Sequence, residues 1–344
     1  MTHTIPRYPP TYRKDEISLI LDAAREGQSL CFVGIAGIGK SNITNFLRHD
    51  PHQYKQQYLG KDAAQFLFPV IEGNSWNQTP QNLWELMLAD LSALTRDLDQ
   101  PPADAKLRQL SDEQRTFSAL RERIQWLTKD HQVMFILDDF DKALQTGPLS
   151  MLEQLSTLRN AGNRNKLSYL IFTKKLPHRL GQAHPLLNNS KFYDLFKDAI
   201  YALKPYNYQD AQQMLLFLNE NADKPLQMKD LPLIREKLTG GLAGLTTIVF
   251  NIWRRTPPDT DDLITFFAEK PEVRNECQRI YQGLHCHEQQ VARRVAHYQQ
   301  TDEDQPVIDH LLRRGLLVNA PNGEWFSPLW ANFLRSDKGE TDNG

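Results

Sequence analysis

Residues 30–44 join a short apolar run to a cluster of three glycines, and this stretch restricts the fold more than any other part of the chain. The run LCFVG is typical of a strand buried on both faces, and KSNITNFLRH after the glycines has the pattern of a helix. Glycine allows backbone conformations in which consecutive N–H groups turn towards one point. The segment GIAGIGKS fits G-x-x-x-x-G-K-[ST] between a strand and a helix, so it predicts a loop that surrounds phosphate groups.

The backbone and the side chains of this loop have different predicted roles. The N-terminus of the following helix adds a favourable partial positive charge for phosphate. Lys40 would reach the β- and γ-phosphates and act in catalysis, and the Ser41 hydroxyl would ligate Mg²⁺. A glycine-rich turn with an incidental Lys-Ser is the alternative, which the flanking strand and helix disfavour. The residues predicted to bind the nucleotide here are Gly34, Ile35, Ala36, Gly37, Ile38, Gly39, Lys40, Ser41 and Asn42.

A second motif supplies the carboxylates that a nucleotide-bound metal ion needs. The run VMFILDDFD is an apolar strand that ends in Asp138 and Asp139. Asp138 fits the Walker B position as a Mg²⁺ ligand, and Asp139 would polarise the attacking water as a catalytic residue. Alone, such a pair would more often be a surface turn, and the upstream loop makes the functional interpretation the better one. Asp141 is either solvated or supports the acidic pair.

Alternation of strands and helices predicts a doubly wound α/β domain over residues 1–205. Helical patterns separate five apolar runs, and Thr79-Pro80 has the composition of a helix start. The runs are not alternating, which is typical of strands inside a parallel sheet. The five predicted strands are residues 30–34, 66–72, 133–139, 168–174 and 199–205.

Two further domains are predicted after Pro205. Residues 206–270 have only helical patterns, the first of which starts after Asn207, and predict an all-helical domain. Residues 271–344 combine helical stretches with two short apolar runs around Pro321-Asn322-Gly323, which is a hairpin signal. Helices followed by a hairpin are the make-up of a winged helix.

Composition excludes several classes of protein. The net charge of the 344 residues is -2, so the chain as a whole is not a polybasic nucleic-acid binder. We expect no membrane partner, because no apolar run approaches the length of a membrane span and no signal peptide is evident. Three cysteines suggest a reducing compartment, and the cytoplasm is the simplest prediction.

These motifs together resemble the STAND branch of the P-loop ATPases, which is close to the AAA+ origin-recognition proteins. The resemblance covers about residues 8–335. ILDDFD resembles the Walker B run, TGGLAGL the glycine motif of the lid, and VIDHLLRRGLLV with EWFSPLWANFL the winged helix. It implies a sheet in the strand order 5-1-4-3-2, with bound ATP and Mg²⁺. It also implies that Arg13 lies near the adenine and that Thr173, in FTKK, senses the γ-phosphate.

Three positions depart from the family pattern. The proline of the lid motif is Ala243, the sensor arginine is Lys174, and no histidine stands near Ser327. The pattern therefore does not predict a tightly ADP-locked off state.

Other clusters of residues have weaker predicted roles. Arg159 and Arg164 lie where relatives often place an arginine finger for a neighbouring subunit. The pairs at 293–294 and 313–314 could contact DNA phosphates or could be solvated helix faces. The cysteines and histidines at 277–287 lack the paired spacing of a zinc site.

The sequence therefore predicts an ATP-binding, slowly hydrolysing molecular switch whose lid and winged helix move with the nucleotide and control an unknown protein partner. Self-association through the nucleotide domain is part of this hypothesis. A DNA-binding ATPase of the origin-recognition or transposition-helper type is one alternative, and a non-hydrolysing ATP-dependent scaffold is another. ATP is preferred to GTP because no guanine-specifying N-K-x-D run is present.

Overall fold

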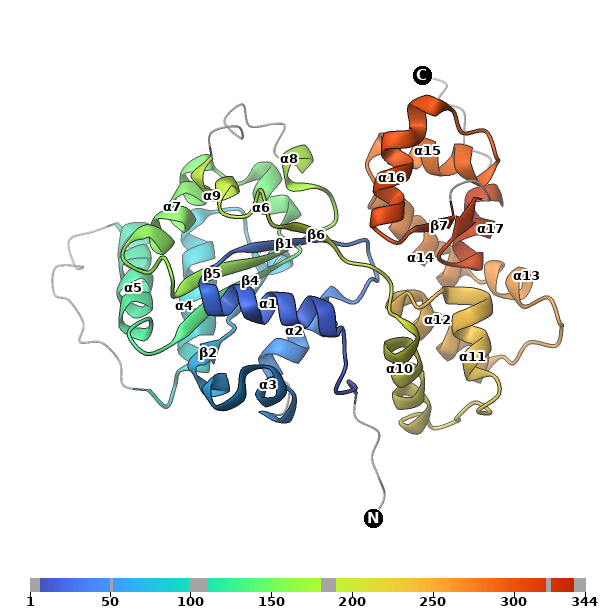
Figure 1. Ribbon diagram of the computed structural model, residues 1–344, viewed down its shortest axis with the longest axis horizontal. Helices are drawn as coiled ribbons and strands as arrows, with labels where there is room; N and C mark the ends of the chain where they lie inside the picture. Colours follow the sequence, from blue (N-terminus) through green and yellow to red (C-terminus); the bar gives the residue numbers. More distant parts are fainter. Residues whose placement is uncertain (1–6, 50–51, 99–110, 181–189, 320–322, 337–344) are drawn as a thin grey trace, which may run out of the picture. The chain divides into compact units, whose positions relative to one another are not determined.

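A computed structural model describes residues 7–49, 52–98, 111–180, 190–319 and 323–336 (Figure 1). Within these residues, none of the helices combines the length and the apolar composition that crossing a membrane requires.

The residues group into two compact units. One consists of Met1–Lys14, Gly34–Gly39 and Ala202–Gly344, and the other of Asp15–Val33 and Lys40–Tyr201. The glycine-rich loop is thus grouped with the C-terminal unit, whereas the strand before it and the helix after it belong to the sheet-containing unit.

Among the described residues, six strands form one sheet in the order β2-β4-β5-β1-β6, and β3 also pairs with β4 (Figure 1). The pairs β1–β5, β4–β5, β2–β4 and β3–β4 are all parallel. The predicted order 5-1-4-3-2 is confirmed, because the five predicted strands are β1, β2 with β3, β4, β5 and β6. The strand bounds are β1 Leu30–Val33, β2 Phe66–Leu67, β3 Val70–Glu72, β4 Gln132–Asp138, β5 Leu167–Thr173 and β6 Ile200–Ala202.

The predicted strand at 66–72 is divided by Pro69. Proline has no N–H to donate to a neighbouring strand, so the ladder is interrupted there. Its carbonyl still accepts a hydrogen bond from the backbone N–H of Ile136 at 2.8 Å, which keeps both short strands on the edge of β4.

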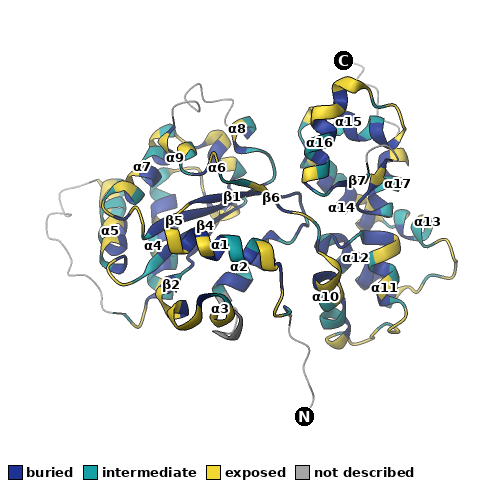
Figure 2. Cartoon of the chain, viewed as in Figure 1, coloured by how far each residue is buried: buried dark blue, intermediate teal, exposed yellow. Residues whose placement is uncertain are grey.

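Strand side chains alternate between two buried faces, as period-two geometry requires. One face carries Phe135, Leu137, Tyr169 and Ile171, which join a core with residues of α4, α5, α6, α7 and α9. The other face carries Phe32, Ile136, Leu170 and Phe172, and the strands appear buried in Figure 2. In Figure 1, α1 crosses in front of the strands. The helix bounds are α1 Lys14–Glu26, α2 Lys40–His49, α3 His52–Leu59, α4 Pro80–Leu94, α5 Asp112–Leu127, α6 Asp141–Thr146, α7 Leu149–Asn160, α8 Pro177–Leu180 and α9 Lys191–Asp194.

Local capping explains where two predicted helices begin. The Thr79 side chain accepts a hydrogen bond from the Asn82 backbone N–H, and Pro80 occupies the first turn of α4. Asn207 accepts from the Asp210 backbone N–H in the same way at the start of α10. Both predicted starts are confirmed.

The described residues after β6 are mostly helical, in agreement with the sequence. An antiparallel hairpin of β7 and β8 precedes the last helix, and the predicted turn residues Pro321 and Asn322 lie outside the described residues. Trp325 and Trp330 are buried, as expected for core residues. The bounds are α10 Tyr208–Glu220, α11 Leu231–Leu233, α12 Ala243–Arg255, α13 Leu263–Ala268, α14 Pro271–Gln282, α15 Cys286–Ala296, α16 Gln305–Arg313, β7 Leu317–Asn319, β8 Glu324–Trp325 and α17 Pro328–Ser336.

A buried ion cluster joins α15 to α16. The Glu288 carboxylate accepts a hydrogen bond from Arg314 at 3.0 Å and lies 3.1 Å from Nε2 of His310. The backbone N–H of His285 also donates to it at 2.7 Å. Burial alone would raise the pKa of Glu288, but the hydrogen bond to His310 and the charge of Arg314 outweigh this and lower the pKa to about 2.

Replacing Glu288 by Gln should destabilise these helices by about 3 kcal/mol, because Arg314 would remain buried without its opposite charge. Since the folded-state pKa is lowered, the contribution of Glu288 is complete above its unfolded pKa of about 4.3 and is lost as the pH falls towards about 2. Calorimetry of wild type and Glu288→Gln between pH 7 and pH 3 measures both effects. The exposed Glu303 supplies the control, and equal losses in Glu288→Gln and Glu303→Gln would contradict this account.

Candidate functional site

Parallel pairing brings the carboxyl ends of the central strands to one edge of the sheet. Val33, the last residue of β1, is in register with Thr173, the last residue of β5. β4 lies on the other side of β5 and ends at Asp138. Polar residues that follow different strands therefore meet at this edge, where open α/β sheets bind ligands.

Two lysines converge on Asp139. Its Oδ1 lies 3.6 Å from Nζ of Lys40 and 3.5 Å from Nζ of Lys174. These distances are those of ion pairs and exceed those of good hydrogen bonds. The Oδ1 atom is buried, and no described residue donates a hydrogen bond to it. Asp139 thus keeps an oxygen without a hydrogen-bond donor beside two positive charges.

The acidic pair is arranged by the backbone of Asp139. Its φ of 47° is in the left-handed region, which is uncommon for a residue other than glycine. Its backbone N–H donates to Oδ1 of Asp138 at 2.9 Å. The two carboxylates therefore occupy different surroundings, with Asp138 held at the end of β4 and Asp139 turned towards the lysines.

Burial perturbs the protonation of both Lys40 and Asp138. Burial lowers the pKa of Lys40, and the carboxylates of Asp139 and Asp138 partly offset this effect. Burial, followed by repulsion from Asp139, raises the pKa of Asp138 to about 6. Several charged groups are therefore buried together at the carboxyl end of β4. Perturbed pKa values of this kind are common at functional sites.

Thr173 and Lys174, the two positions expected to sense phosphate, have different surroundings in the turn after β5. Thr173 is fully buried, and its hydroxyl donates to the Lys175 carbonyl at 2.8 Å. The Lys174 side chain is partly exposed, and its ammonium lies beside Asp139. In this arrangement, Lys174 rather than Thr173 offers a group to a phosphate.

Asp141 is not a freely solvated residue. Its two carboxylate oxygens accept hydrogen bonds from the Lys174 backbone N–H at 2.9 and 3.0 Å, and Oδ1 also accepts from Lys175 at 3.3 Å. Of the two roles expected for this residue, the structure gives it the supporting one.

The glycines of the loop make close contacts within their own unit. Gly37 and Gly39 have φ values of 72° and 97°, which only glycine adopts easily. An ideal Cβ at Gly39 would lie 2.8 Å from the Tyr206 hydroxyl oxygen. The Gly37 carbonyl accepts a hydrogen bond from the Gly244 backbone N–H at 2.8 Å. The loop therefore needs glycine both for its positive φ angles and for its close contacts with neighbouring residues.

The side chain of Arg13 holds this loop by hydrogen bonds to backbone carbonyl groups. Its guanidinium donates to the carbonyls of Ile38 at 2.8 Å and Lys204 at 3.0 Å, and it lies 4.5 Å from the centre of the Tyr206 ring. Only 2% of Arg13 is exposed. Its contacts therefore suit positioning of the loop better than direct contact with an adenine.

Glu276 and Arg279 also contact the loop, and the sequence interpretation missed both. They form a two-pronged ion pair with distances of 2.8 and 2.7 Å. A Cβ at Gly37 would lie 2.3 Å from Oε1 of Glu276. The i, i+3 spacing could have indicated the ion pair, but no local pattern indicates its contact with residues far away in the sequence.

The remaining donors fit a magnesium site of the P-loop kind. Ser41 lies exposed in the first turn of α2, and Asp138 is at the end of β4. Among the described residues, no group of three or more His, Cys, Asp and Glu side chains could hold a metal ion. Mg²⁺ needs only one or two protein oxygens, because phosphates and waters complete its shell. Cys277 is buried, whereas Cys286 is exposed.

Two of the four arginines considered for DNA contact have structural roles instead. Arg294 is paired with Asp304, and Arg314 is buried against Glu288. Arg293 stacks on the Tyr281 ring at 4.8 Å. Arg313 is the exposed member of its pair. Arg314 fits neither of the two expected roles, phosphate contact or a solvated helix face, because its side chain is 2% exposed.

The two candidate arginine fingers differ in exposure. Arg159 donates to the Gly27 carbonyl at 2.7 Å and is partly buried. Arg164 is exposed near the start of β5. Of the two, Arg164 is the one with a side chain on the surface.

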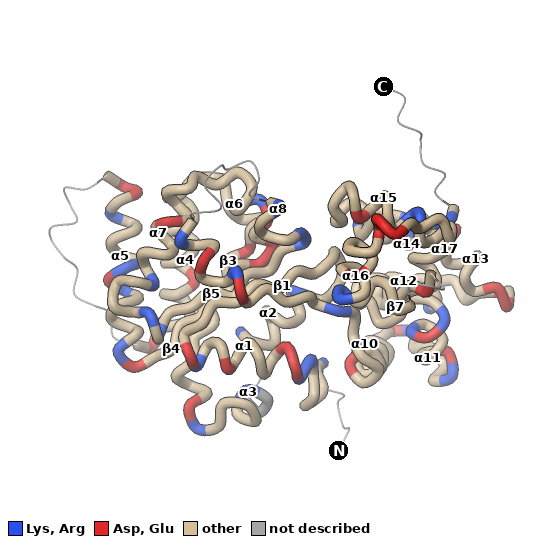
Figure 3. The backbone as a smooth tube through the Cα atoms, turned by 45° about the horizontal axis from the view of Figure 1, so that its top comes forward, with Lys and Arg blue, Asp and Glu red and all other residues tan. Residues whose placement is uncertain are grey.

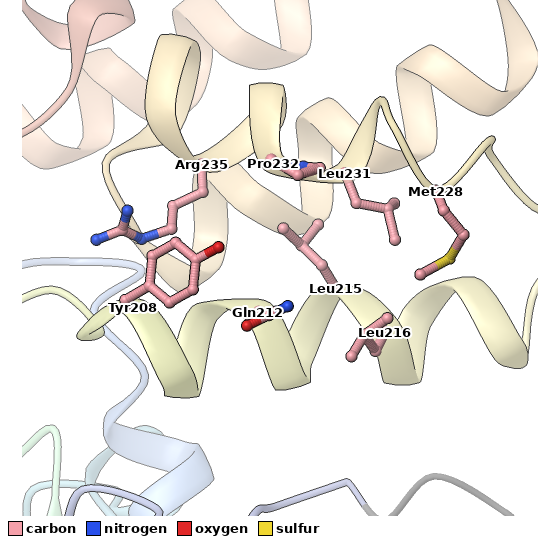
Figure 4. A pocket seen from close by; sticks show the side chains of 8 residues that line it. All are labelled: Tyr208, Gln212, Leu215, Leu216, Met228, Leu231, Pro232 and Arg235. Carbon is pink, nitrogen blue, oxygen red and sulfur yellow. The ribbon is translucent and has the colours of Figure 1, made fainter.

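A pocket of different character lies between α10 and α11 (Figure 4). Its lining is largely apolar, and its one charged residue, Arg235, stacks on Tyr208 at 4.8 Å. It contains no carboxylate, so it lacks the groups that a phosphate-bound metal ion needs. The lining residues are Tyr208, Gln212, Leu215, Leu216, Met228, Leu231, Pro232 and Arg235.

We call the carboxyl ends of β1, β4 and β5, with Lys40, Asp138, Asp139 and Lys174, the acidic edge. Most of these residues lie in a segment that matches a known family. Residues 9–171 match the family of the AAA ATPase domain. The fold is similar to that of the Walker-type ATPase PABY2304 of Pyrococcus abyssi, with 13% identity, a TM-score of 0.55, and 94% of this chain and 95% of that chain covered. A comparison with curated proteins gives no match.

Two other solved structures are similar at lower scores. Cdc6p from Pyrobaculum aerophilum has 13% identity and a TM-score of 0.48, with 98% of this chain and 97% of that chain covered. The Orc1 protein of Aeropyrum pernix, in complex with DNA, has 14% identity and a TM-score of 0.46, with 90% and 78% covered.

The segment that carries the loop, Lys40 and Asp138 thus matches the family of the AAA ATPase domain. The P-loop ATPase part of the sequence resemblance is confirmed. The STAND assignment and the winged helix stay predictions.

Replacing Gly39 by Ala should weaken nucleotide binding at least about tenfold, because the methyl group meets Tyr206 and the backbone needs a positive φ. Gly162→Ala is the matched control, since Gly162 has a φ of 88° and nothing within 4 Å of the added Cβ. Titration with a fluorescent ATP analogue compares the two. Equal affinity of wild type and Gly39→Ala would show that this close packing has no part in binding.

Proposed function

We propose that the chain is an ATP-driven molecular switch that binds ATP with Mg²⁺ and hydrolyses it slowly. The convergence of Lys40 and Lys174 on Asp139 carries this proposal. Two lysines and an acidic residue with an unsatisfied oxygen are what phosphoryl transfer to water needs at one place.

The residues of the acidic edge would divide the chemistry among them. Lys40 and Lys174 stabilise negative charge that develops on the transferred phosphoryl group. The carboxylate of Asp139, whose side chain is 28% exposed, would accept a hydrogen bond from the attacking water and orient it. Asp138 and Ser41 would hold Mg²⁺, which neutralises phosphate charge when it is bound.

The two lysines also explain why such an enzyme would be slow on its own. Both ammonium groups are paired with Asp139, so a phosphate must compete with that carboxylate for them. An arginine from a second copy of the chain would add charge that this site lacks, and the exposed Arg164 is the candidate.

We place a helical lid at 206–270 and a winged helix at 271–344 as part of this proposal. Helices α14, α15 and α16 followed by the β7–β8 hairpin support the second assignment. In the STAND manner, these parts would move with the nucleotide and control a protein partner.

Lys40→Ala should weaken ATP binding about tenfold or more, whereas Asp139→Asn should keep binding but lose turnover about a hundredfold. Phosphate release and equilibrium binding, measured on the same preparations, separate the two effects. Lys129→Ala, at an exposed position outside the acidic edge, is the control. Full function of Asp139→Asn in the presence of a partner would favour the non-hydrolysing scaffold.

A DNA-binding ATPase is the second candidate, and the exposure of Arg313 beside the hairpin favours it. The hairpin also exposes 58% of Val318. Figure 3 shows Lys and Arg mixed with Asp and Glu over the C-terminal helices, so a DNA-contacting face would be local rather than broad.

On this second reading, Arg313→Gln should weaken duplex binding and reduce the salt slope by about 1, the amount for one lost phosphate contact. Arg121→Gln makes the same charge change at an exposed position of α5 and should leave binding unchanged. Fluorescence anisotropy at several salt concentrations is the measurement. A wild type that binds no duplex with ATP present would exclude this candidate.

A further inference from the structure

Asp141 connects two chain segments that meet at the acidic edge. It is the first residue of α6, directly after the turn that carries Asp139. Its carboxylate reaches the backbone N–H groups of Lys174 and Lys175, 33 and 34 residues away in the sequence. The Asp139 turn and the turn after β5 are therefore held together by a side chain.

Other hydrogen bonds make this connection rigid. The backbone N–H of Phe140 donates to the Phe172 carbonyl at 3.0 Å. The Thr173 hydroxyl donates to the Lys175 carbonyl at 2.8 Å and closes the turn from inside. With these bonds in place, Asp141 fixes the direction in which residue 174 leaves the sheet.

The ammonium of the same residue meets Asp139. Lys174 is bound through its backbone by Asp141 and lies 3.5 Å through its side chain from Oδ1 of Asp139. A lysine side chain is long and flexible, so its placement depends on how firmly its backbone is held.

We propose that Asp141 is a positioning residue that sets Lys174 against Asp139 and so prepares both for turnover. It acts through the backbone of Lys174 and touches no reacting atom. The predicted effect on turnover rests on the proposed ATPase function. The predicted effect on the placement of Lys174 does not.

The chain provides a matched control for this role. The Glu153 carboxylate accepts hydrogen bonds from the Ser190 hydroxyl at 3.0 Å and from the Lys191 backbone N–H at 3.1 Å. It therefore joins two segments in the same way at α7 and α9, and among the described residues it forms no ion pair with a lysine of the kind that Asp139 forms. Asp141→Ala and Glu153→Ala remove comparable connections.

The first measurement is the rate at which acetic anhydride modifies Lys174, followed by mass spectrometry with the exposed Lys129 as internal reference. Asp141→Ala should speed modification of Lys174 about threefold, the factor expected for losing a half-exposed ion pair. Asp139→Asn should give a similar increase, and Glu153→Ala none. Unchanged reactivity of Lys174 in Asp141→Ala would overturn the proposal, whether or not the protein hydrolyses ATP.

The second measurement is turnover. Asp141→Ala should lower kcat about tenfold or more while ATP affinity stays within about threefold, and Asp141→Asn, which keeps one acceptor oxygen, should lie between it and wild type. Lys174→Ala combined with Asp141→Ala should be no slower than Lys174→Ala alone, because both act through one group.

Additive losses in the double variant, or an equal loss of kcat in Glu153→Ala, would contradict positioning through Lys174. If the wild type shows no turnover, the proposed function fails, and the reactivity of Lys174 decides the positioning role by itself.

Discussion

The parallel pairing of β5 between β1 and β4 is the constraint on which the acidic edge depends. β1 leads into the glycine loop, β4 ends in the acidic pair, and β5 ends at Thr173. Because the strands are parallel, the three chain segments leave the sheet on the same side. An antiparallel β5 would place Lys174 at the opposite edge, and Asp139 would lose one of its two cationic neighbours. The strand topology thus brings together residues that are far apart in the sequence.

Positive and negative side chains lie close together at this edge. Lys40 and Lys174 face Asp139, while Asp138 is buried with a raised pKa. Such a cluster is costly to assemble in a low-dielectric place, and the hydrogen bonds from backbone N–H groups to Asp138 and Asp141 offset part of that cost. The C-terminal helices also contain a buried charge cluster. There, the single carboxylate of Glu288 lies close to both Arg314 and His310.

Much of the fold could be predicted because its signals are local. Apolar runs marked the strands, and Thr79 and Asn207 marked helix starts, since capping depends on residues only three positions apart. The strand order followed from the class of P-loop protein that the motifs resemble. The division of the 66–72 run at Pro69 could have been anticipated from the missing N–H.

The supporting contacts could not be predicted in the same way. Arg13 reaches Ile38 and Lys204, and Arg314 reaches Glu288, each across a sequence separation that carries no periodic signal. A charged residue in a helical pattern is expected at the surface, and the sequence gives no sign that Arg314 is buried against Glu288. Identities of phosphate-loop residues are visible in sequence, whereas the residues that hold the loop in shape are set by tertiary contacts.

The three cysteines differ sharply in their surroundings. Burial raises the pKa of both Cys31 and Cys277 to about 12, whereas Cys286 is exposed at the start of α15. Because thiolates react and buried thiols do not, a maleimide dye would attach at a single position without any cysteine being removed. The native chain therefore carries its own labelling site on the helices that precede the hairpin. A fluorophore there would report on the surroundings of α15 as nucleotide is added, in a protein otherwise unaltered.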